Sequence, residues 1–368
     1  MCTARWREPG RPAVLCRIVG RGPCPRRRSS GLTASEGGRF LLCLLAAALA
    51  AAIQPSASAQ GGQPYSTATR AAAGLPRLHS LVVSSEGKIV FEYYARGQSA
   101  NRAANIKSAA KSVISALVGI AIDRRLIRGV QEPIVTYFPE LKRDKDPRKQ
   151  NITIEDLLTM RSGLESTSGR NYGTWVNSRN WVAFALGRPL VSGPGTSMQY
   201  STGSSHLLSA IITKASGTST WQFAQDTLGR AMNTNLPRWT RDPQGIYFGG
   251  NEMSMTPRQM ISFGEIYLNG GRANGKQVIP ADWVRTSCVP RTSSRFDSDR
   301  EYGYGWWIDE VGGHDACYAW GFGGQYVLVF SDLRLVVAVT SSTALSDERH
   351  GYRRQLFDLL ERHVLPGP

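Results

Sequence analysis

The sequence lacks most of the short motifs that mark common enzyme sites. It has no Gly-x-Ser-x-Gly nucleophile motif, no phosphate-binding loop ending in Gly-Lys-Ser/Thr, no His-Glu-x-x-His and no intact Gly-x-Gly-x-x-Gly. Histidine is scarce and there is no Cys-x-x-Cys, so no metal site and no cofactor are expected. The five histidines are isolated along the chain, at His79, His206, His314, His350 and His363.

Acidic residues are also few, which leaves a formal net charge of +16 over 368 residues. Residues 1–59 hold nine of the 44 Lys and Arg but two of the 28 Asp and Glu. In the rest of the chain the arginines are scattered rather than gathered into a basic stripe, so nucleic-acid binding is not expected.

The N-terminal segment has the pattern of an export signal. Arginines, among them Arg39, precede an unbroken apolar run over residues 40–53, which is short for a membrane span and of the right length for a signal-peptide core. Small residues at 57–59 predict cleavage before Gln60. We therefore expect a signal peptide over 1–59, a flexible leader over 60–77 and a periplasmic or secreted protein without stable membrane insertion. An N-terminal membrane anchor or a buried helix is the alternative.

Cysteine usage agrees with export. After residue 59 the chain retains two cysteines, Cys288 and Cys317, and the spacing leaves open whether they form a disulfide or remain free thiols.

The hydrophobic pattern predicts an α/β (α+β) fold. Strand-like runs over 78–84 and 88–95 meet at a turn signal, and residues 108–122 read as a helix buried on all sides. Helical pieces broken by Gly, Pro and Asn follow to about residue 300. Strand character then returns, over 304–309, 326–331 and 335–341, before an amphipathic helix over 348–363.

Strands at both ends of the chain favour one antiparallel sheet flanked by helices. We therefore predict an α/β domain built from residues 78–124 and 300–368, with an inserted helical domain over 125–299.

A serine followed three residues later by a lysine occurs twice. Ser85 and Lys88 sit in a predicted hairpin turn, where nothing would remove the lysine from water. Ser108 and Lys111 open the most apolar helix, where residues three apart share a face and where burial lowers the pKa of a lysine. A neutral lysine there could accept the serine proton. The alternative is that Ser108 only caps the helix.

Two further segments carry groups suited to this chemistry. Tyr200 precedes an apolar helix, and it could relay protons if a nearby cation lowers the pKa of its hydroxyl, for which Lys111 is the available cation. The glycine-rich segment 320–325 leads directly into a strand, where glycines let a substrate approach closely and expose N–H groups for an oxyanion hole. An ordinary Gly-rich turn is the alternative.

Taken together, these segments resemble the serine β-lactamase and penicillin-binding-protein superfamily, in particular class C β-lactamases, related esterases and 6-aminohexanoate-dimer hydrolases. Ser108 and Lys111 match the first motif, and Tyr200 matches the second, Tyr-x-Asn, with Thr202 in place of Asn. The third motif, Lys/His-Thr-Gly, is replaced by residues 321–323. The segment 153–164 and the approaches to the second and third motifs also match, so the resemblance covers about residues 78–365.

The resemblance implies a role for each residue. Ser108 would be the acyl-enzyme nucleophile, with Lys111 and Tyr200 sharing proton transfer in an order that the sequence does not fix. The N–H groups of Ser108 and Gly324 would form the oxyanion hole. Substrate would contact a group of residues around the three motifs, namely Thr202, Tyr172, Gly321, Phe322 and Gly323, and Trp175 would either wall the pocket or belong to the core.

The expected function is an exported serine hydrolase that acts through an acyl-enzyme on a small ester or amide, and weak β-lactamase activity is compatible with this function. The altered second and third motifs favour a carboxylesterase or amidase over a true β-lactamase or DD-peptidase. A catalytically inactive cell-envelope binding protein on the same fold is the rival from another class. The oligomeric state is not predicted.

Overall fold

The computed structural model describes residues 65–294 and 300–367. The described residues form one compact unit. The predicted signal peptide and its cleavage site thus lie outside the described residues and stay predictions, as does the division into an α/β domain and an insertion.

An antiparallel sheet of eight strands forms the centre of the described chain, in the order β2-β1-β12-β11-β10-β9-β8-β7. The N-terminal strand β1 lies inside this sheet, with Val82 opposite Ala338 of β12 and Glu92 of β2. The predicted sheet of N- and C-terminal strands is therefore confirmed. Its strands are β1 (Leu78–Ser85), β2 (Lys88–Tyr94), β7 (Thr292–Ser293), β8 (Glu301–Tyr302), β9 (Trp307–Val311), β10 (His314–Gly321), β11 (Gln325–Phe330) and β12 (Leu335–Ser341).

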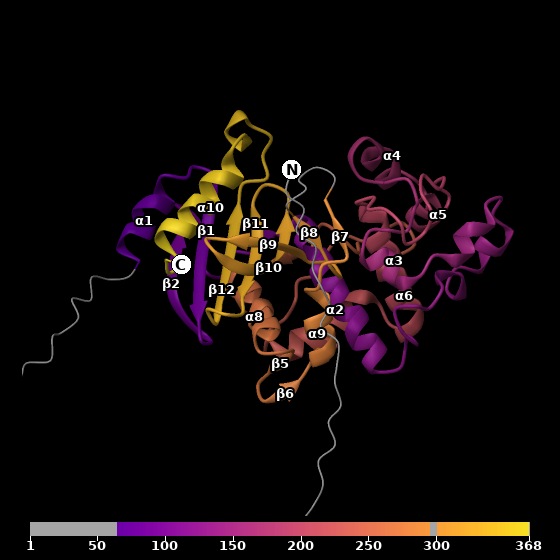
Figure 1. Ribbon diagram of the computed structural model, residues 1–368, viewed down its shortest axis with the longest axis horizontal. Helices are drawn as coiled ribbons and strands as arrows, with labels where there is room; N and C mark the ends of the chain where they lie inside the picture. Colours follow the sequence, from indigo (N-terminus) through magenta and orange to yellow (C-terminus); the bar gives the residue numbers. More distant parts are fainter. Residues whose placement is uncertain (1–64, 295–299, 368) are drawn as a thin grey trace, which may run out of the picture. The chain divides into compact units, whose positions relative to one another are not determined.

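The central strands are apolar and buried on both faces, because helices cover each face. On one face lie α1 (Ser66–Ala73) and α10 (Tyr352–His363), which contact each other (Figure 1). Helix α1 falls within the segment expected to be a flexible leader, and that expectation is wrong for residues 66–73. Ala68 and Ala72 are fully buried there, so this short helix belongs to the core.

The opposite face is covered by α8 (Pro257–Leu268), which contacts β1, β11 and β12. Gly264 makes this packing close, since a Cβ atom there would lie 2.5 Å from Val336. Helix α2 (Ala110–Asp123) is almost wholly buried, and it contacts both strand β10 and helix α6 (Thr202–Ser216). The predicted buried helix is therefore confirmed, two residues later than expected.

The long section between the strands is helical, as predicted. Figure 1 shows α3, α4, α5 and α6 grouped together, away from α1 and α10, and both α3 and α5 contact α6. The remaining elements are α3 (Ile154–Leu158), α4 (Tyr172–Val176), α5 (Trp181–Leu186), α7 (Thr220–Ala224), α9 (Ala281–Ser287) and the short strands β3 (Ala104–Asn105), β4 (Ser254–Met255), β5 (Arg272–Ala273) and β6 (Lys276–Gln277).

A disulfide bond joins Cys288, at the end of α9, to Cys317 in β10, which settles the pairing that the sequence left open. It ties the helical section to the strand that leads into the third motif.

Candidate active site

Ser108 lies in a single 3₁₀ turn, Lys107–Ala109, directly before α2. Lys107 has a left-handed backbone, with φ of 51°, which is uncommon for a residue with a side chain. Its N–H donates to the side chain of Asn105, and its ammonium pairs with Glu252 at 3.0 Å. These contacts hold the unusual turn that presents Ser108, and strained backbone of this kind gathers at functional sites.

Lys111 lies one turn later and faces Ser108. Its Nζ atom is 3.0 Å from Ser108 Oγ, 3.4 Å from Thr202 Oγ1 and 2.9 Å from the carbonyl oxygen of Gly250. The side chain is 3% exposed, and its removal from water lowers the pKa of Lys111 to about 7. The expected lowering by burial is therefore confirmed, and near neutral pH a large fraction of this lysine is uncharged.

Tyr200 lies beside the same pair, two residues before α6. Its backbone carbonyl accepts from Ser166 Oγ at 2.6 Å, and its ring stacks on Trp307. Burial raises the pKa of Tyr200 to about 12, which a hydrogen bond with Ser108 only partly offsets. The pKa of Tyr200 is therefore not lowered by Lys111, because burial has the larger effect.

Thr202 occupies the position at which the resemblance implies an asparagine. Its Oγ1 atom lies 3.0 Å from Ser168 Oγ, and its N–H donates to the same hydroxyl at 3.0 Å. Because Lys111 also contacts it, the Thr202 hydroxyl is held within the site rather than projected freely toward a substrate. Ser168 was not identified from the sequence.

The third motif lies next to the Ser108 turn. A Cβ atom at Gly321 would lie 2.0 Å from the carbonyl oxygen of Ile106, so only glycine allows β10 to end this close to the turn. Pairing between β10 and β11 ends at Gly321 and Gln325, and residues 322–324 form the connecting turn. Phe322 is 42% exposed at its tip.

The N–H of Gly324, expected to point into an oxyanion hole, donates instead to the carbonyl of Gly321 at 3.2 Å. A Cβ atom at Gly324 would meet the ring of Tyr352, which shows that this residue faces α10. The assignment of Gly324 to the oxyanion hole is therefore not supported by the geometry. The turn lines a cavity of about 150 Å³ together with α10 residues and Arg77.

Tyr172 lies near the candidate site, whereas Trp175 lies in the core. Tyr172 is half-buried, and its hydroxyl accepts from Asn251 Nδ2 at 2.7 Å, beside the Gly250 carbonyl that holds Lys111. Trp175 is fully buried and donates to the carbonyl of Trp181, so it belongs to the core.

A segment that sequence reasoning missed crosses the site over residues 249–253. It supplies the Gly250 carbonyl to Lys111, and a Cβ atom at Gly250 would lie 3.1 Å from Lys111 Nζ. The run Phe248-Gly249-Gly250-Asn251 is the signal that could have marked it, because paired glycines permit close backbone approach. By contrast, Ser85 and Lys88 lie at the β1–β2 hairpin with Lys88 exposed, as expected of a chance motif.

Within residues 65–294 and 300–367 no cluster of three or more His, Cys, Asp or Glu side chains could hold a metal ion. No helix in the same ranges is both long enough and apolar enough to cross a membrane.

The structure thus combines a sheet flanked by helices with a serine, a buried lysine and a tyrosine that lie close together. This is the arrangement that the resemblance to serine β-lactamases and penicillin-binding proteins implies. The Beta-lactamase family profile matches residues 79–360, and the chain belongs to that family.

Solved structures with the same fold include hydrolases. A Bacillus anthracis protein named provisionally as a 6-aminohexanoate-dimer hydrolase superposes with a TM-score of 0.65 at 21% identity, over 78% of this chain and 80% of that one. EstCE1, a hydrolase with promiscuous acyltransferase activity, gives 0.65 at 14% identity over 80% and 97%. A D-stereospecific amidohydrolase from a Streptomyces species gives 0.62 at 15% identity over 81% of this chain and 97% of that one.

Proposed function

We propose that this chain is a serine hydrolase that acts through an acyl-enzyme on small esters or amides. The observation that carries the proposal is the 3.0 Å contact between Lys111 Nζ and Ser108 Oγ, made by a lysine whose pKa is about 7. A serine hydroxyl becomes a nucleophile when a neighbouring base takes its proton, and a buried lysine is such a base.

In the proposed reaction, Ser108 Oγ forms a bond to the carbonyl carbon of the substrate while its proton passes to Lys111. The tetrahedral intermediate then expels the alcohol or amine, which leaves with a proton from the site. Water adds to the acyl-enzyme in the same way and releases the acid, which restores the Ser108 hydroxyl. No external redox partner is required.

The two pKa values favour an order of roles. Near pH 7 Lys111 is partly neutral and can accept a proton, whereas Tyr200, with a pKa of about 12, retains its own and can donate it. We therefore assign the first proton transfer to Lys111 and assign Tyr200 to protonating the leaving group.

For the oxyanion hole we propose the N–H of Ser108 and that of Phe322. Phe322 directly follows Gly321, whose backbone lies against the Ser108 turn, and it stands beyond the last paired residue of β10. Backbone N–H groups at such a position stabilise the charge that develops on the substrate oxygen.

The third motif favours neutral substrates. Gly321 has no side chain and Phe322 no hydroxyl, so the motif offers no Lys, His or Thr for a substrate carboxylate. Arg291, a candidate source of that charge, pairs with Glu155 at 3.3 Å and stacks on Tyr304. This argues for an esterase or amidase rather than a β-lactamase or DD-peptidase. Retention of Ser108, Lys111 and Tyr200 argues against an inactive binding protein.

Export with cleavage near Gln60 completes the proposal. The apolar run over 40–53 supports it, and so does the Cys288–Cys317 disulfide, since disulfides persist in oxidising compartments. N-terminal sequencing of protein from a periplasmic or culture fraction should begin close to Gln60. A mature chain that retains residues 40–53 would indicate a membrane anchor instead.

The experiment that tests the catalytic proposal is intact-mass analysis after exposure to a fluorophosphonate. A single covalent adduct, with parallel loss of hydrolysis of p-nitrophenyl butyrate, is expected. An unmodified protein that still hydrolyses the ester would refute a serine mechanism.

A further inference from the structure

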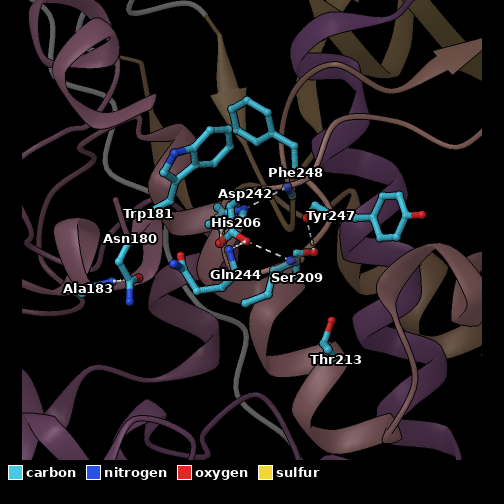
Figure 2. A network of polar contacts seen from close by, with 12 residues as sticks. Asn180, Trp181, Ala183, His206, Ser209, Thr213, Asp242, Gln244, Tyr247 and Phe248 are labelled. Carbon is cyan, nitrogen blue, oxygen red and sulfur yellow. Dashed lines mark hydrogen bonds and ion pairs between the residues drawn. The ribbon is translucent and has the colours of Figure 1, made fainter. Parts of the chain in front are cut away.

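A buried histidine and aspartate lie behind the proposed site and take no part in the mechanism above. His206 Nε2 is 3.0 Å from Asp242 Oδ2, and neither side chain is exposed at all. Figure 2 shows the pair with Trp181 and Phe248 beside it, and Trp175 completes the aromatic surroundings. A buried polar pair is retained only when its hydrogen bonds are satisfied, so each partner is informative.

The hydrogen bonds define the tautomer of His206. Gly249 donates its backbone N–H to His206 Nδ1 at 3.4 Å, so Nδ1 carries no proton and Nε2 donates to Asp242. The other carboxylate oxygen of Asp242 accepts the N–H groups of Gln244 and Ile246, at 2.9 and 2.8 Å. Asp242 is thus fixed by backbone on one side and fixes the histidine on the other.

The backbone that His206 holds leads directly to the proposed catalytic group. We name residues 247–253 the strap. Ser209 Oγ donates to the carbonyl of Tyr247, and a Cβ atom at Gly249 would lie 2.1 Å from the carbonyl oxygen of Ser205, so the strap lies flat on α6. Gly250, which follows Gly249 in the strap, accepts a hydrogen bond from Lys111 Nζ at its carbonyl oxygen, at 2.9 Å.

The far end of the strap is anchored at the Ser108 turn. Glu252 pairs with Lys107, and the carbonyl of Met253 accepts the N–H of Ile106 at 2.9 Å. The strap therefore runs from the histidine, over Lys111, to the residues that precede Ser108.

We propose that the His206–Asp242 pair is a positioning device for Lys111, which holds the strap in the place where its Gly250 carbonyl contacts the lysine and shields it from water. His206 is a positioning residue, since it acts through Gly249 and touches no reacting atom. The inference rests on the proposed function, because it assigns the strap a part in setting the state of the base.

Loss of the His206–Asp242 support should raise the pKa of Lys111. The titratable and charged groups near Lys111 are Tyr200, under its ammonium at 5.0 Å from the ring centroid, and the Lys107–Glu252 pair at the end of the strap. Burial alone depresses the pKa of Lys111. A displaced strap would admit water, which raises the pKa of Lys111 toward its ordinary value. Loss of the Gly250 carbonyl contact would lower the pKa, but we expect the effect of hydration to be larger.

Asp242→Asn is the central variant. Because Gln244 and Ile246 donate to Oδ1, the amide oxygen of the new side chain stays there and its NH₂ group faces His206 Nε2. The histidine must then accept at Nε2 and carry its proton on Nδ1, where it opposes the N–H of Gly249. A carboxylate that sets a histidine tautomer acts in this manner in other sites.

Two substitutions of the histidine separate the contacts. His206→Gln can keep the donor to Asp242 but loses the acceptor for Gly249, whereas His206→Asn can keep that acceptor and loses the donor. Thr213→Val is the control, because it removes a part-buried hydroxyl contact of α6, to Thr220 at 3.0 Å, and leaves in place the hydrogen bond of Ser209 to the strap.

The measurement is the pH profile of kcat/KM for p-nitrophenyl butyrate between pH 5 and 9, with thermal unfolding of each variant. We expect Asp242→Asn and His206→Gln to raise the midpoint of the acid limb by at least about half a pH unit and to lower kcat/KM at pH 7 about tenfold. His206→Asn should deviate less than His206→Gln, and Thr213→Val should keep the wild-type midpoint even if it unfolds at a lower temperature.

Two outcomes would refute different statements. Wild-type midpoints in folded Asp242→Asn and His206→Gln, or the same shift in Thr213→Val, would overturn the positioning role alone. A wild-type profile without an acid limb near pH 7, together with full activity of Lys111→Ala, would overturn the proposed function and the positioning role with it.

Discussion

The Nζ atom of Lys111 lies over the ring of Tyr200, 5.0 Å from the ring centroid. Burial acts on the two groups in opposite directions, since it lowers the pKa of Lys111 to about 7 and raises that of Tyr200 to about 12. The pair can thus hold a base and an acid at the same pH, which is what two successive proton transfers on one substrate require.

The first prediction concerns pH. Since the pKa of Lys111 is about 7 and its neutral form is the base, kcat/KM should fall about tenfold for each unit below pH 7 and level off above it. Tyr200→Phe should lower the plateau while leaving the midpoint close to 7. Rate measurements with p-nitrophenyl butyrate give both values, and a midpoint above pH 9 would contradict the role of Lys111.

The second prediction concerns cooperation between the two groups. Lys111→Ala and Tyr200→Phe should each lower turnover by about two orders of magnitude or more, because each removes a proton-transfer partner. The double variant should lose far less than the product of the two, since groups that act as a unit are not additive. Fully additive losses would mean that Lys111 and Tyr200 act independently rather than as one proton-transfer unit.

The third prediction concerns the nucleophile. Ser108→Ala should abolish fluorophosphonate labelling, as the hydroxyl next to Lys111 is removed. Ser85→Ala is the matched control and should label normally, because Lys88 on the hairpin is exposed. Peptide mapping that places the adduct on any other serine would reject the assignment.

The fourth prediction concerns substrate preference. A missing charge-assisted hydrogen bond costs about 1.5 to 3 kcal/mol, so the carboxylate of a cephalosporin should bind poorly beside Gly321 and Phe322. We expect a higher kcat/KM for p-nitrophenyl butyrate than for a chromogenic cephalosporin on the same preparation. A tenfold advantage for the cephalosporin would favour a β-lactamase. The Arg349→Gln variant then shows whether this arginine, at the cavity beside the third motif, supplies the charge.

The fifth prediction concerns the disulfide. It joins residues at a sequence separation of 29, for which the loss of denatured-chain entropy contributes about 3.6 kcal/mol. Replacing Cys288 and Cys317 by serine should lower the free energy of unfolding by about that amount, as measured by urea denaturation at equilibrium. Equal stability of the oxidised protein and the double variant would show that the cross-link does not constrain the unfolded chain.

Much of this arrangement follows from local sequence patterns, and the remainder does not. The apolar run after Ser108 predicted a buried helix and a lysine of lowered pKa, because burial acts on any lysine so placed. The opposite shift at Tyr200 follows from its burial by segments distant in the sequence, and the spacing of motifs does not contain that information. Strand β10 was missed because its alternation is interrupted by polar residues that face solvent only at one end.

The strap and the role of Gly324 also required coordinates. Gly250 reaches Lys111 only because α6 and β3–β4 place distant segments together, and no feature of its own neighbourhood identifies the partner. For Gly324, the sequence shows a glycine at a strand edge but not the direction of its N–H, which the tight turn commits to Gly321.

The pairing of β1 with β12 has a consequence for how the chain folds during synthesis. Val82 can pair with Ala338 only after all the residues between them have left the ribosome, whereas the helical section between them can form from local contacts. The sheet edge that carries Gly321 is likewise assembled from late strands. The nascent chain therefore has all of its proposed catalytic side chains long before it has an active enzyme.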